Sequence, residues 1–545
     1  MLISIDIGHS YVKCMVYDPC RRPQHQIYSI EAMGDEVNVN YIRNVFSVQF
    51  ENDKMKVMRV GSVDLFDDGM IAVDKLKSYM NRQDMRVPVD ESSLFIDSEE
   101  LLCFLFNHIR KKVIGLSPAD TIRAVITIPV SYSEVQKKRL RNAAKRVGME
   151  VYMILTEPFA GLFSRWEWLT SNDKPLRKAL IFDIGAGTID ASCVKIRRSG
   201  SSFNVSTLMA TNLAVGGNDI SEMLYNDIFG SKDYQDIIDN VARELITSPA
   251  SPEGSKAYMY NLAAKRQKII ADLKNCVNKM KESICSNYDR DKRNYFPIEK
   301  VSTNLMVTKL ADYFDTINSG NITRSYSDID RLIRESDYDI GGMINRMIAD
   351  FETRCMINDV DSVIFLGGSA RVHFFREVIL KELSAFVDNV DVCMEDINNC
   401  DNLNDIARGA LEFARQLEKK TISSFTDQVS LDTFEYGTIN AKGVYVPLAP
   451  NIRNSGEIHV SAPETMLTMP DGSKKKCVSV YRQSLRRSCG KQSETAVYIG
   501  SVEVPESHKS SGVKIGLGYD PGKGISAALY HHRDNTRLTD DVYLK

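Results

Sequence analysis

One short pattern occurs twice in this chain, and it constrains the possible fold more than any other feature. Each copy is an apolar strand that ends in Asp-Ile-Gly, followed by a turn and a second β-branched strand. The copies are Ile5–Gly8 and Phe182–Gly185. Glycine in such a turn lets backbone N–H groups converge on an anion, while the aspartate holds a cation beside it. Either copy alone fits an ordinary hairpin, but the pair predicts two homologous halves that face each other across a cleft.

The second copy is the more explicit of the two. The strand from Ala179 ends at Asp183, the chain turns through Gly185-Ala186-Gly187, and Thr188 opens the returning strand. The return as a strand, and the absence of Gly-Lys-Ser/Thr, separate this pattern from the strand-loop-helix phosphate loop. It indicates a metal–phosphate site of a different kind.

A third glycine turn, residues 367–371, follows the apolar strand Ser362–Leu366 and precedes a helix, whose N-terminus can bind a polar or anionic ligand group.

An earlier segment has the order strand, helix, strand. The first strand runs from Ala124 to Val130, and the helix begins at the capping box Ser133-x-x-Gln136. This order predicts an α/β domain. The segment from Val73 to Arg82, with Lys75 and Lys77, has a basic helical pattern. Its simplest interpretation is a solvated helix face.

Composition limits the classes of function. The 545 residues are 26% charged and 43% hydrophobic with a net charge of -3, which argues against disorder and against nucleic acid as the main partner. Eleven cysteines without a Cys-x-x-Cys pair indicate reduced thiols and a cytoplasmic location. No basic leader opens the chain, and no apolar segment approaches the ~18 residues that span a bilayer, so we expect no membrane partner.

In combination these motifs resemble the nucleotide-binding domain of the DnaK-type heat-shock chaperones, within the actin-like ATPase and sugar-kinase superfamily. The resemblance includes Ile5–Ser10 as the first phosphate motif, Ala124–Pro129 through Glu157-Pro158 as a connecting segment, Leu180–Asp190 as the second phosphate motif, and Phe365–Arg371 as the adenosine motif. It covers about residues 1–418. A weaker resemblance to the family's peptide-binding β domain follows, at 500–505 and 518–526.

The resemblance implies an α/β fold: a duplicated actin-like ATPase domain, two lobes around a nucleotide cleft, then a β-sandwich. The expected boundaries are 1–418 for the nucleotide-binding domain, with a helical subdomain at about 219–300, 419–426 for a polar linker, and 427–545 for the β-sandwich. The implied ligands are ATP or ADP with Mg2+. The implied contacts are Asp6, Gly8, His9, Ser10, Gly185, Ala186, Gly187, Thr188, Gly216, Gly217, Lys281, Gly367, Gly368, Ser369 and Arg371.

The resemblance also implies catalytic roles. Asp6 and Asp183 would face Mg2+, mostly through its water molecules. Lys77 would approach the γ-phosphate, and Glu157 and Asp183 would orient the attacking water. Thr188 would hold the β- and γ-phosphates.

Several positions depart from the family pattern. His9 replaces a threonine and is expected to slow hydrolysis, Ala186 replaces the middle glycine of the second turn, and Asn278 stands where a glutamate is usual. The segment Lys420–Asp427 lacks the family's leucine-rich linker, so the resemblance does not imply coupling between the domains. We also expect no helical lid after the β domain.

Three hypotheses follow from the sequence. The first is an ATP-binding, slowly hydrolysing chaperone-like protein whose β domain binds unfolded or extended polypeptide segments, with co-chaperones as further partners. The second is a nucleotide-dependent regulatory or scaffold protein that docks a dedicated folded partner, with weak or no turnover. The third, a sugar or acetate kinase, ranks lower because of the long β-rich C-terminal domain and the match at Glu157-Pro158.

Overall fold

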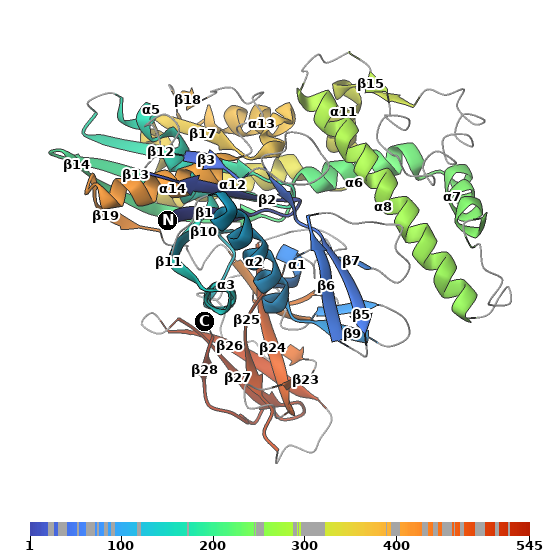
Figure 1. Ribbon diagram of the computed structural model, residues 1–545. Helices are drawn as coiled ribbons and strands as arrows, with labels where there is room; N and C mark the ends of the chain where they lie inside the picture. The colour runs from blue at the N-terminus through green and yellow to red at the C-terminus, as the bar shows by residue number, and fades with distance from the viewer. Residues whose placement is uncertain are drawn as a thin grey trace.

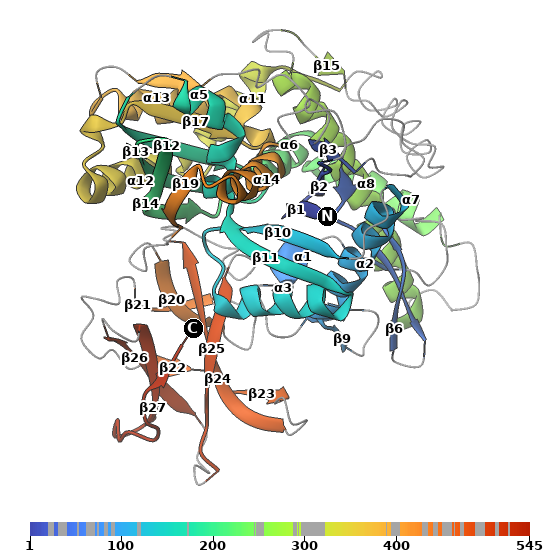
Figure 2. The ribbon, with the colours of Figure 1, turned by 60° about the vertical axis from the view of Figure 1, so that its left-hand side comes forward.

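Figures 1 and 2 show an α/β body of two lobes above a β-rich C-terminal domain, in a computed structural model of the chain. The structure describes residues 1–19, 27–30, 41–51, 54–61, 71–73, 76–80, 85–88, 93–116, 121–171, 174–244, 246, 256–286, 292, 294–295, 322–387, 390–393, 404–427, 434–439, 445–449, 460–462, 464–468, 474–484, 496–506, 512–520 and 524–544.

The first lobe is built on a six-stranded sheet with the order β11-β10-β1-β2-β3, in which β4 also pairs with β2. Its strands are β1 (Leu2–Ile7), β2 (Tyr11–Tyr17), β3 (Ile27–Ser29), β4 (Ile42–Arg43), β10 (Ile122–Ile128) and β11 (Met149–Thr156). β1 is parallel to β10 on one side and antiparallel to β2 on the other. The helices α2 (Ser98–Leu116) and α3 (Glu134–Arg146) belong to this lobe.

The second lobe repeats this arrangement, with the order β18-β17-β12-β13-β14-β19. Its strands are β12 (Leu176–Ile184), β13 (Ile189–Ser199), β14 (Ser202–Leu213), β17 (Ser362–Leu366), β18 (Asp391–Cys393) and β19 (Ile422–Thr426). β12 is parallel to β17 and antiparallel to β13, so it corresponds to β1. The predicted duplicated α/β fold is therefore confirmed.

Helices connect and cover the two sheets. They are α4 (Glu157–Leu162), α5 (Trp166–Thr170), α6 (Gly217–Phe229), α7 (Lys232–Glu244), α8 (Lys256–Ser286), α11 (Tyr326–Glu335), α12 (Ile340–Cys355), α13 (His373–Leu383) and α14 (Asp405–Glu418). In Figure 2, α14 lies at the junction of the lobes, where the Ser4 hydroxyl donates a hydrogen bond to the carbonyl of Ala407 at 2.6 Å. The expected helical insert corresponds to α6, α7 and α8.

Two expectations for helix starts had different outcomes. The capping box of Ser133 and Gln136 is present at the start of α3. The helix expected from Val73 to Arg82 is wrong in extent, because only Leu76–Met80 (α1) is helical. Val73 instead ends β7 (Ile71–Val73) and pairs with Phe46 of β5 (Phe46–Glu51). Because Val73 pairs with β5, the first residue of the predicted helix is in a strand instead. Lys75 and residues 81–82 lie outside the described part of the chain.

Outside the C-terminal domain, the remaining described strands form small separate sheets or pair with β5. They are β6 (Lys54–Val60), β8 (Met85–Pro88), β9 (Ser93–Ile96), β15 (Asn294–Tyr295) and β16 (Thr323–Arg324).

The C-terminal domain consists of two sheets. One has the order β21-β20-β24-β23 with β25 beside β24, and the other has the order β22-β26-β27-β28. The strands are β20 (Phe434–Ile439), β21 (Tyr445–Ala449), β22 (Val460–Ala462), β23 (Thr465–Thr468), β24 (Lys474–Ser484), β25 (Val497–Glu503), β26 (Val513–Asp520), β27 (Gly524–His531) and β28 (Val542–Tyr543). Buried Tyr436, Val480, Ile515 and Leu529 share one core, as expected for a β-sandwich.

The β domain contacts the first lobe directly. The Arg482 Nε donates a hydrogen bond to the Ser131 carbonyl at 2.8 Å, and the Gln136 Nε2 donates one to the Tyr498 carbonyl at 3.0 Å. Both contacts lie at the N-terminal end of α3. The β domain therefore sits against the lobe that carries the first phosphate motif, as Figure 1 shows.

The segment expected as a polar linker forms a strand. β19 pairs in parallel with β14 and extends the second sheet, with Ile422 buried and the following residues exposed. At its end, Asp427 accepts hydrogen bonds from the backbone N–H and the hydroxyl of Thr156, each at 2.7 Å. The segment is thus held to both lobes, although it lacks an apolar run.

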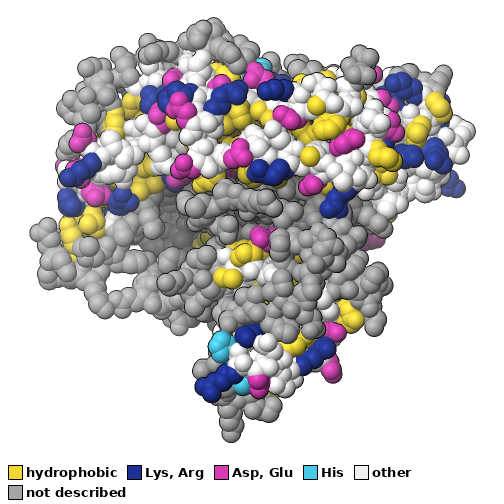
Figure 3. Space-filling model, turned by 180° about the vertical axis from the view of Figure 1, so that it is seen from behind, with side chains coloured by type: hydrophobic (Ala, Val, Ile, Leu, Met, Phe, Trp, Pro, Cys, Tyr) yellow, Lys and Arg dark blue, Asp and Glu magenta, His cyan; other side chains and the backbone are white. Residues whose placement is uncertain are grey.

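Figure 3 shows that acidic and basic side chains are interspersed over the described part of one face. Within the described residues, no helix combines the length and the apolar character that crossing a bilayer requires.

Candidate functional site

The first hairpin brings Asp6 to the edge of a pocket. In the β1–β2 register Asp6 lies opposite Lys13. The Gly8 N–H donates a hydrogen bond to the Tyr11 carbonyl at 2.9 Å, and a Cβ on Gly8 would lie 2.6 Å from that oxygen. The Asn44 Nδ2 donates to the Gly8 carbonyl at 2.7 Å. Glycine is therefore required for this tight turn.

The second hairpin carries Asp183 at the end of β12. Its turn closes with a hydrogen bond from the Gly185 N–H to the Thr188 carbonyl at 2.8 Å. Gly217 donates from its backbone to the Gly185 carbonyl at 3.1 Å, and a Cβ on Gly216 would lie 2.7 Å from the same oxygen. Gly216 and Gly217 therefore support the phosphate turn from behind.

The third glycine turn lies beside Asp183. Gly367 has a φ of +83°, and a Cβ there would overlap the Asp183 Oδ1 and the Ile184 carbonyl. Only glycine adopts this conformation without strain and leaves this space. The turn then continues as a single 3-10 turn, Gly368–Arg371.

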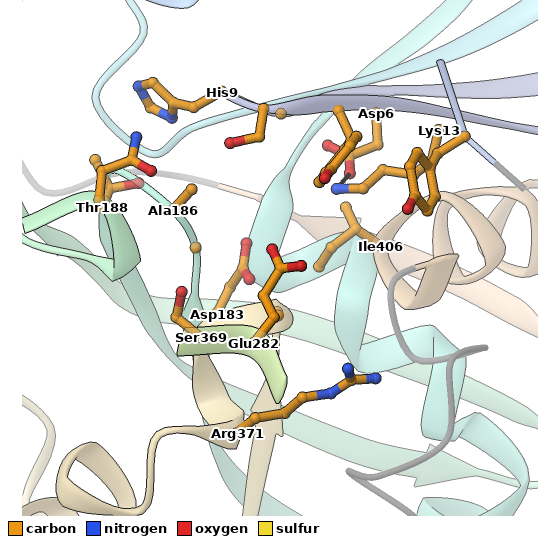
Figure 4. A pocket seen from close by; sticks show the side chains of 18 of the residues that line it. Asp6, His9, Lys13, Asp183, Ala186, Thr188, Glu282, Ser369, Arg371 and Ile406 are labelled. Atoms are coloured by element: carbon orange, nitrogen blue, oxygen red, sulfur yellow. Dashed lines mark hydrogen bonds and ion pairs between the residues drawn. The ribbon is translucent and has the colours of Figure 1, made fainter. Parts of the chain in front are cut away.

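The structure brings most of the predicted residues together around one pocket, part of which Figure 4 shows. The predicted residues that line it are Asp6, Gly8, His9, Ser10, Lys77, Glu157, Asp183, Gly185, Ala186, Thr188, Lys281, Gly367, Gly368, Ser369 and Arg371. Gly187, Gly216 and Gly217 do not line it, but lie directly behind these residues. Residues from both lobes thus surround one space.

A buried ion pair lies within this pocket. The Lys77 Nζ is 2.6 Å from the Glu157 Oε1, and both side chains are 5% exposed. Burial alone would lower the pKa of Lys77, but the carboxylates of Glu157 and Asp6 outweigh burial and raise this pKa. Lys77 is therefore cationic, and it lines the same pocket as residues of both hairpins.

His9 occupies the turn of the first hairpin and lies against the second. A Cβ on Gly187 would come within 2.8–2.9 Å of three His9 ring atoms, so the imidazole fits only over glycine. Burial, with smaller contributions from Lys77 and Lys13, lowers the pKa of His9 to about 3. The imidazole is therefore neutral near pH 7.

Asp183 and its register partner Asp190 form an acidic pair in the second hairpin. Burial, together with Asp190 and Asp6, raises the pKa of Asp183 to about 7. Asp190 accepts hydrogen bonds from the Val130 N–H at 3.0 Å and from the Thr188 hydroxyl at 2.6 Å. Sequence reasoning did not assign Asp190 a role, although its position opposite Asp183 in a hairpin was a usable signal.

Sequence reasoning also missed Lys13, Tyr11, Tyr41 and Glu282, which line the same pocket. The Lys13 Nζ is 3.0 Å from the Asp6 Oδ2, and Figure 4 shows the two side chains pointing toward each other. The rings of Tyr11 and Tyr41 are 4.2 Å apart.

A polar network surrounds Lys281, which also lines the pocket. The Lys281 Nζ donates to the Gly217 carbonyl and to the Ser221 hydroxyl, each at 2.8 Å. Ser221 in turn donates to the Asn278 Oδ1 at 3.0 Å, and the Asn278 Nδ2 donates to the Glu282 Oε1 at 2.9 Å. Burial lowers the pKa of Lys281. Asn278, which lines the pocket, thus connects Ser221 with Glu282.

The donors suit a hydrated Mg2+ only in part. Asp183 lines the pocket and makes no ion pair with another described residue. Asp6 already pairs with Lys13, and no group of three or more His, Cys, Asp or Glu in the described chain could hold a metal directly. Since Mg2+ keeps several waters and needs few direct carboxylates, Asp183 could hold it with Asp6 in a secondary position.

Comparison with known proteins gives a consistent family. The sequence model described as Hsp70 protein matches residues 71–294. A heat shock protein 70 homolog of Acanthamoeba polyphaga mimivirus is 23% identical over 70% of this chain and 38% of its own length. A chaperone protein HscA homolog of Methylococcus capsulatus is 21% identical over 50% of this chain and 35% of its own length. The chain thus spans little more than a third of the length of either relative.

Proposed function

We propose that this chain, which belongs to a divergent branch of the Hsp70-type family, is an ATP-binding and slowly ATP-hydrolysing chaperone-like protein. The observation that carries the proposal is the convergence of three glycine turns from two homologous lobes on one pocket. Asp183 and the Lys77–Glu157 pair lie between these turns. The proposed location is the cytoplasm.

In this proposal each side chain has a distinct role. The backbone of residues 185–187 and the Thr188 hydroxyl hold the phosphates, while Gly367, Gly368, Ser369 and Arg371 bind adenosine with Lys281 beside the sugar. Lys77 stabilises the negative charge that develops during phosphoryl transfer. Glu157 and Asp183 orient the attacking water, and a bound Mg2+ would supply further neutralisation of the phosphates.

Communication with the β domain would pass through Asp427. This residue binds Thr156, which directly precedes Glu157, and its side chain is partly buried. A shift of the segment that contains β19 would therefore move the residue next to a proposed catalytic group. The β domain would bind extended polypeptide segments, and its state would reach the pocket by this route.

Phosphate release from Mg-ATP, measured on the full chain with and without an unfolded model polypeptide, tests the proposal. We expect slow turnover that rises several-fold with polypeptide, and an Asp427→Ala variant that loses most of this rise. The control variant is Asp391→Ala, at an exposed residue of the second lobe, which should behave as the wild type. Intact ATP binding without stimulation would favour the docking of a dedicated folded partner, and turnover that requires a small acceptor would favour a kinase.

A further inference from the structure

Lys13 adds a positive charge to the pocket, besides those of Lys77, Lys281 and Arg371, at a position that no proposed catalytic step uses. It lies on β2 directly opposite Asp6. Its side chain is 16% exposed and that of Asp6 is 4% exposed, so the pair is largely shielded from water. Lys13 also lines the pocket, so the remaining exposed part of its side chain faces the ligand space.

The contacts of Asp6 show that its charge is already compensated. The Asp6 Oδ2 is 3.0 Å from the Lys13 Nζ, and the Asp6 Oδ1 accepts a hydrogen bond from the Thr127 hydroxyl at 3.2 Å. A carboxylate in this state attracts a divalent cation less strongly than an unpaired carboxylate does. Of the two residues that would face Mg2+, only Asp183 makes no ion pair with another described residue.

The ammonium group also lies at the phosphate turn itself. A Cβ on Gly8 would be 3.2 Å from the Lys13 Nζ, so the absence of a side chain at Gly8 leaves Lys13 room beside the turn. An ammonium group carries several N–H donors and can keep one on Asp6 while another binds a phosphate oxygen. Lys77, the other cation between the hairpins, is already bound to Glu157 at 2.6 Å.

We propose that Lys13 is a resident cation of the phosphate site, so that this chain binds a nucleoside polyphosphate with little dependence on a divalent cation. The proposal rests on the proposed nucleotide binding and specifies how the phosphates are neutralised. Lys13 and the backbone of the glycine turns then supply the binding energy that would otherwise require Mg2+. A purely structural ion pair would leave the dependence on Mg2+ unchanged when Lys13 is replaced.

Equilibrium binding of a fluorescent ADP analogue to the full chain, in excess Mg2+ and in EDTA, tests this proposal. For the wild type we expect dissociation constants that differ by less than about tenfold between the two conditions. Lys13→Met removes the charge and keeps the apolar stem. It should bind in Mg2+ but lose about tenfold to a hundredfold more affinity than the wild type in EDTA, the range of a charge-assisted contact.

Three further variants make the result specific. Lys13→Arg should keep most of the EDTA-resistant binding, and Lys111→Met, at an exposed lysine of the same lobe, should match the wild type. Asp6→Asn combined with Lys13→Met removes both charges, so the variant does not leave the buried carboxylate of Asp6 without its partner. Thermal unfolding verifies that this double variant folds. Like Lys13→Met, this double variant should require Mg2+ for tight binding of the analogue.

Two outcomes would overturn the inference in different ways. If the wild type loses binding in EDTA as strongly as Lys13→Met does, Lys13 is only a structural partner of Asp6, while nucleotide binding itself stands. If the folded wild type binds the analogue in neither condition, the proposed function fails and the inference fails with it.

Discussion

The two phosphate hairpins share one backbone design but carry opposite charges at equivalent positions. In each, an aspartate at the end of the first strand lies opposite a residue of the returning strand: Asp6 opposite Lys13, and Asp183 opposite Asp190. The first pair is an ion pair, whereas the second is a pair of carboxylates. Duplication has therefore kept the scaffold while the electrostatics of the two halves diverged.

The difference gives the two hairpins different tasks. Asp6 is neutralised within its own hairpin, and Asp190 is bound by the N–H of Val130 from the other lobe. Of these three aspartates, Asp183 is the one that makes no ion pair or side-chain hydrogen bond with another described residue, and it lines the pocket. In the proposed site, the first hairpin would supply positive charge for phosphate, and the second would supply the acidic group that acts on a water or a cation.

Asp183→Asn removes the pocket carboxylate of the second hairpin and should have the largest effect of the variants considered, a loss of ATP turnover. It removes the one pocket carboxylate of the two hairpins that is engaged in no ion pair or side-chain hydrogen bond among the described residues. We expect ATP turnover to fall by about a hundredfold or more, in the range for a group that directs proton transfer. Steady-state phosphate release measures this, with thermal unfolding to verify the fold and Asp391→Asn as the control. Unchanged hydrolysis would remove Asp183 from the site.

Asp190→Ala tests whether the register partner is structural. The substitution leaves the Val130 N–H and the Thr188 hydroxyl without their acceptor. A buried hydrogen bond to a charged group contributes about 1.5–3 kcal/mol, so we expect a loss of about 2–3 kcal/mol in the free energy of unfolding. Urea denaturation measures it, with exposed Asp391→Ala as the control. A stable variant that has lost only turnover would instead give Asp190 a direct catalytic role.

Sequence patterns predicted those parts of the molecule that depend on local residues. Both hairpins, the Gly367-Gly368 turn and the capping box at Ser133 are set by neighbours in the chain, so their signals survive without any knowledge of tertiary contacts. The duplication then predicted that the turns would meet, because two copies of one strand pattern imply two similar lobes. The sandwich was expected from the weaker resemblance of residues 500–505 and 518–526 to the family's peptide-binding β domain.

What the sequence did not predict depends on partners far away in the chain. β19 is mostly exposed and polar, and its strand conformation comes from pairing with β14 rather than from its own apolar pattern. The contacts of Asp427 with Thr156 and of Arg482 with Ser131 likewise join distant segments. Lys13 is a different case, because the hairpin register placed it opposite Asp6, and only attention to that register would have identified it.

His9 lies where the two hairpins touch, and its replacement should produce the smallest of the effects considered. The pKa of His9 is about 3 in the folded protein and near 6.5 when unfolded, so the unfolded chain binds more protons between these values. Stability conferred by neutral His9 is therefore complete above about pH 7 and is lost as the pH falls toward 3.

Urea denaturation at pH 7 and pH 5 measures this effect as a difference between the wild type and His9→Thr. The wild type should lose about 1–2 kcal/mol more than the variant between the two pH values, because the other histidines contribute equally to both proteins. Equal losses would mean that His9 is solvated and accessible to protons.

If the imidazole also slows hydrolysis through its contact with Gly187, the same variant should hydrolyse ATP faster at pH 7. An unaltered rate would leave His9 as a packing residue between the hairpins.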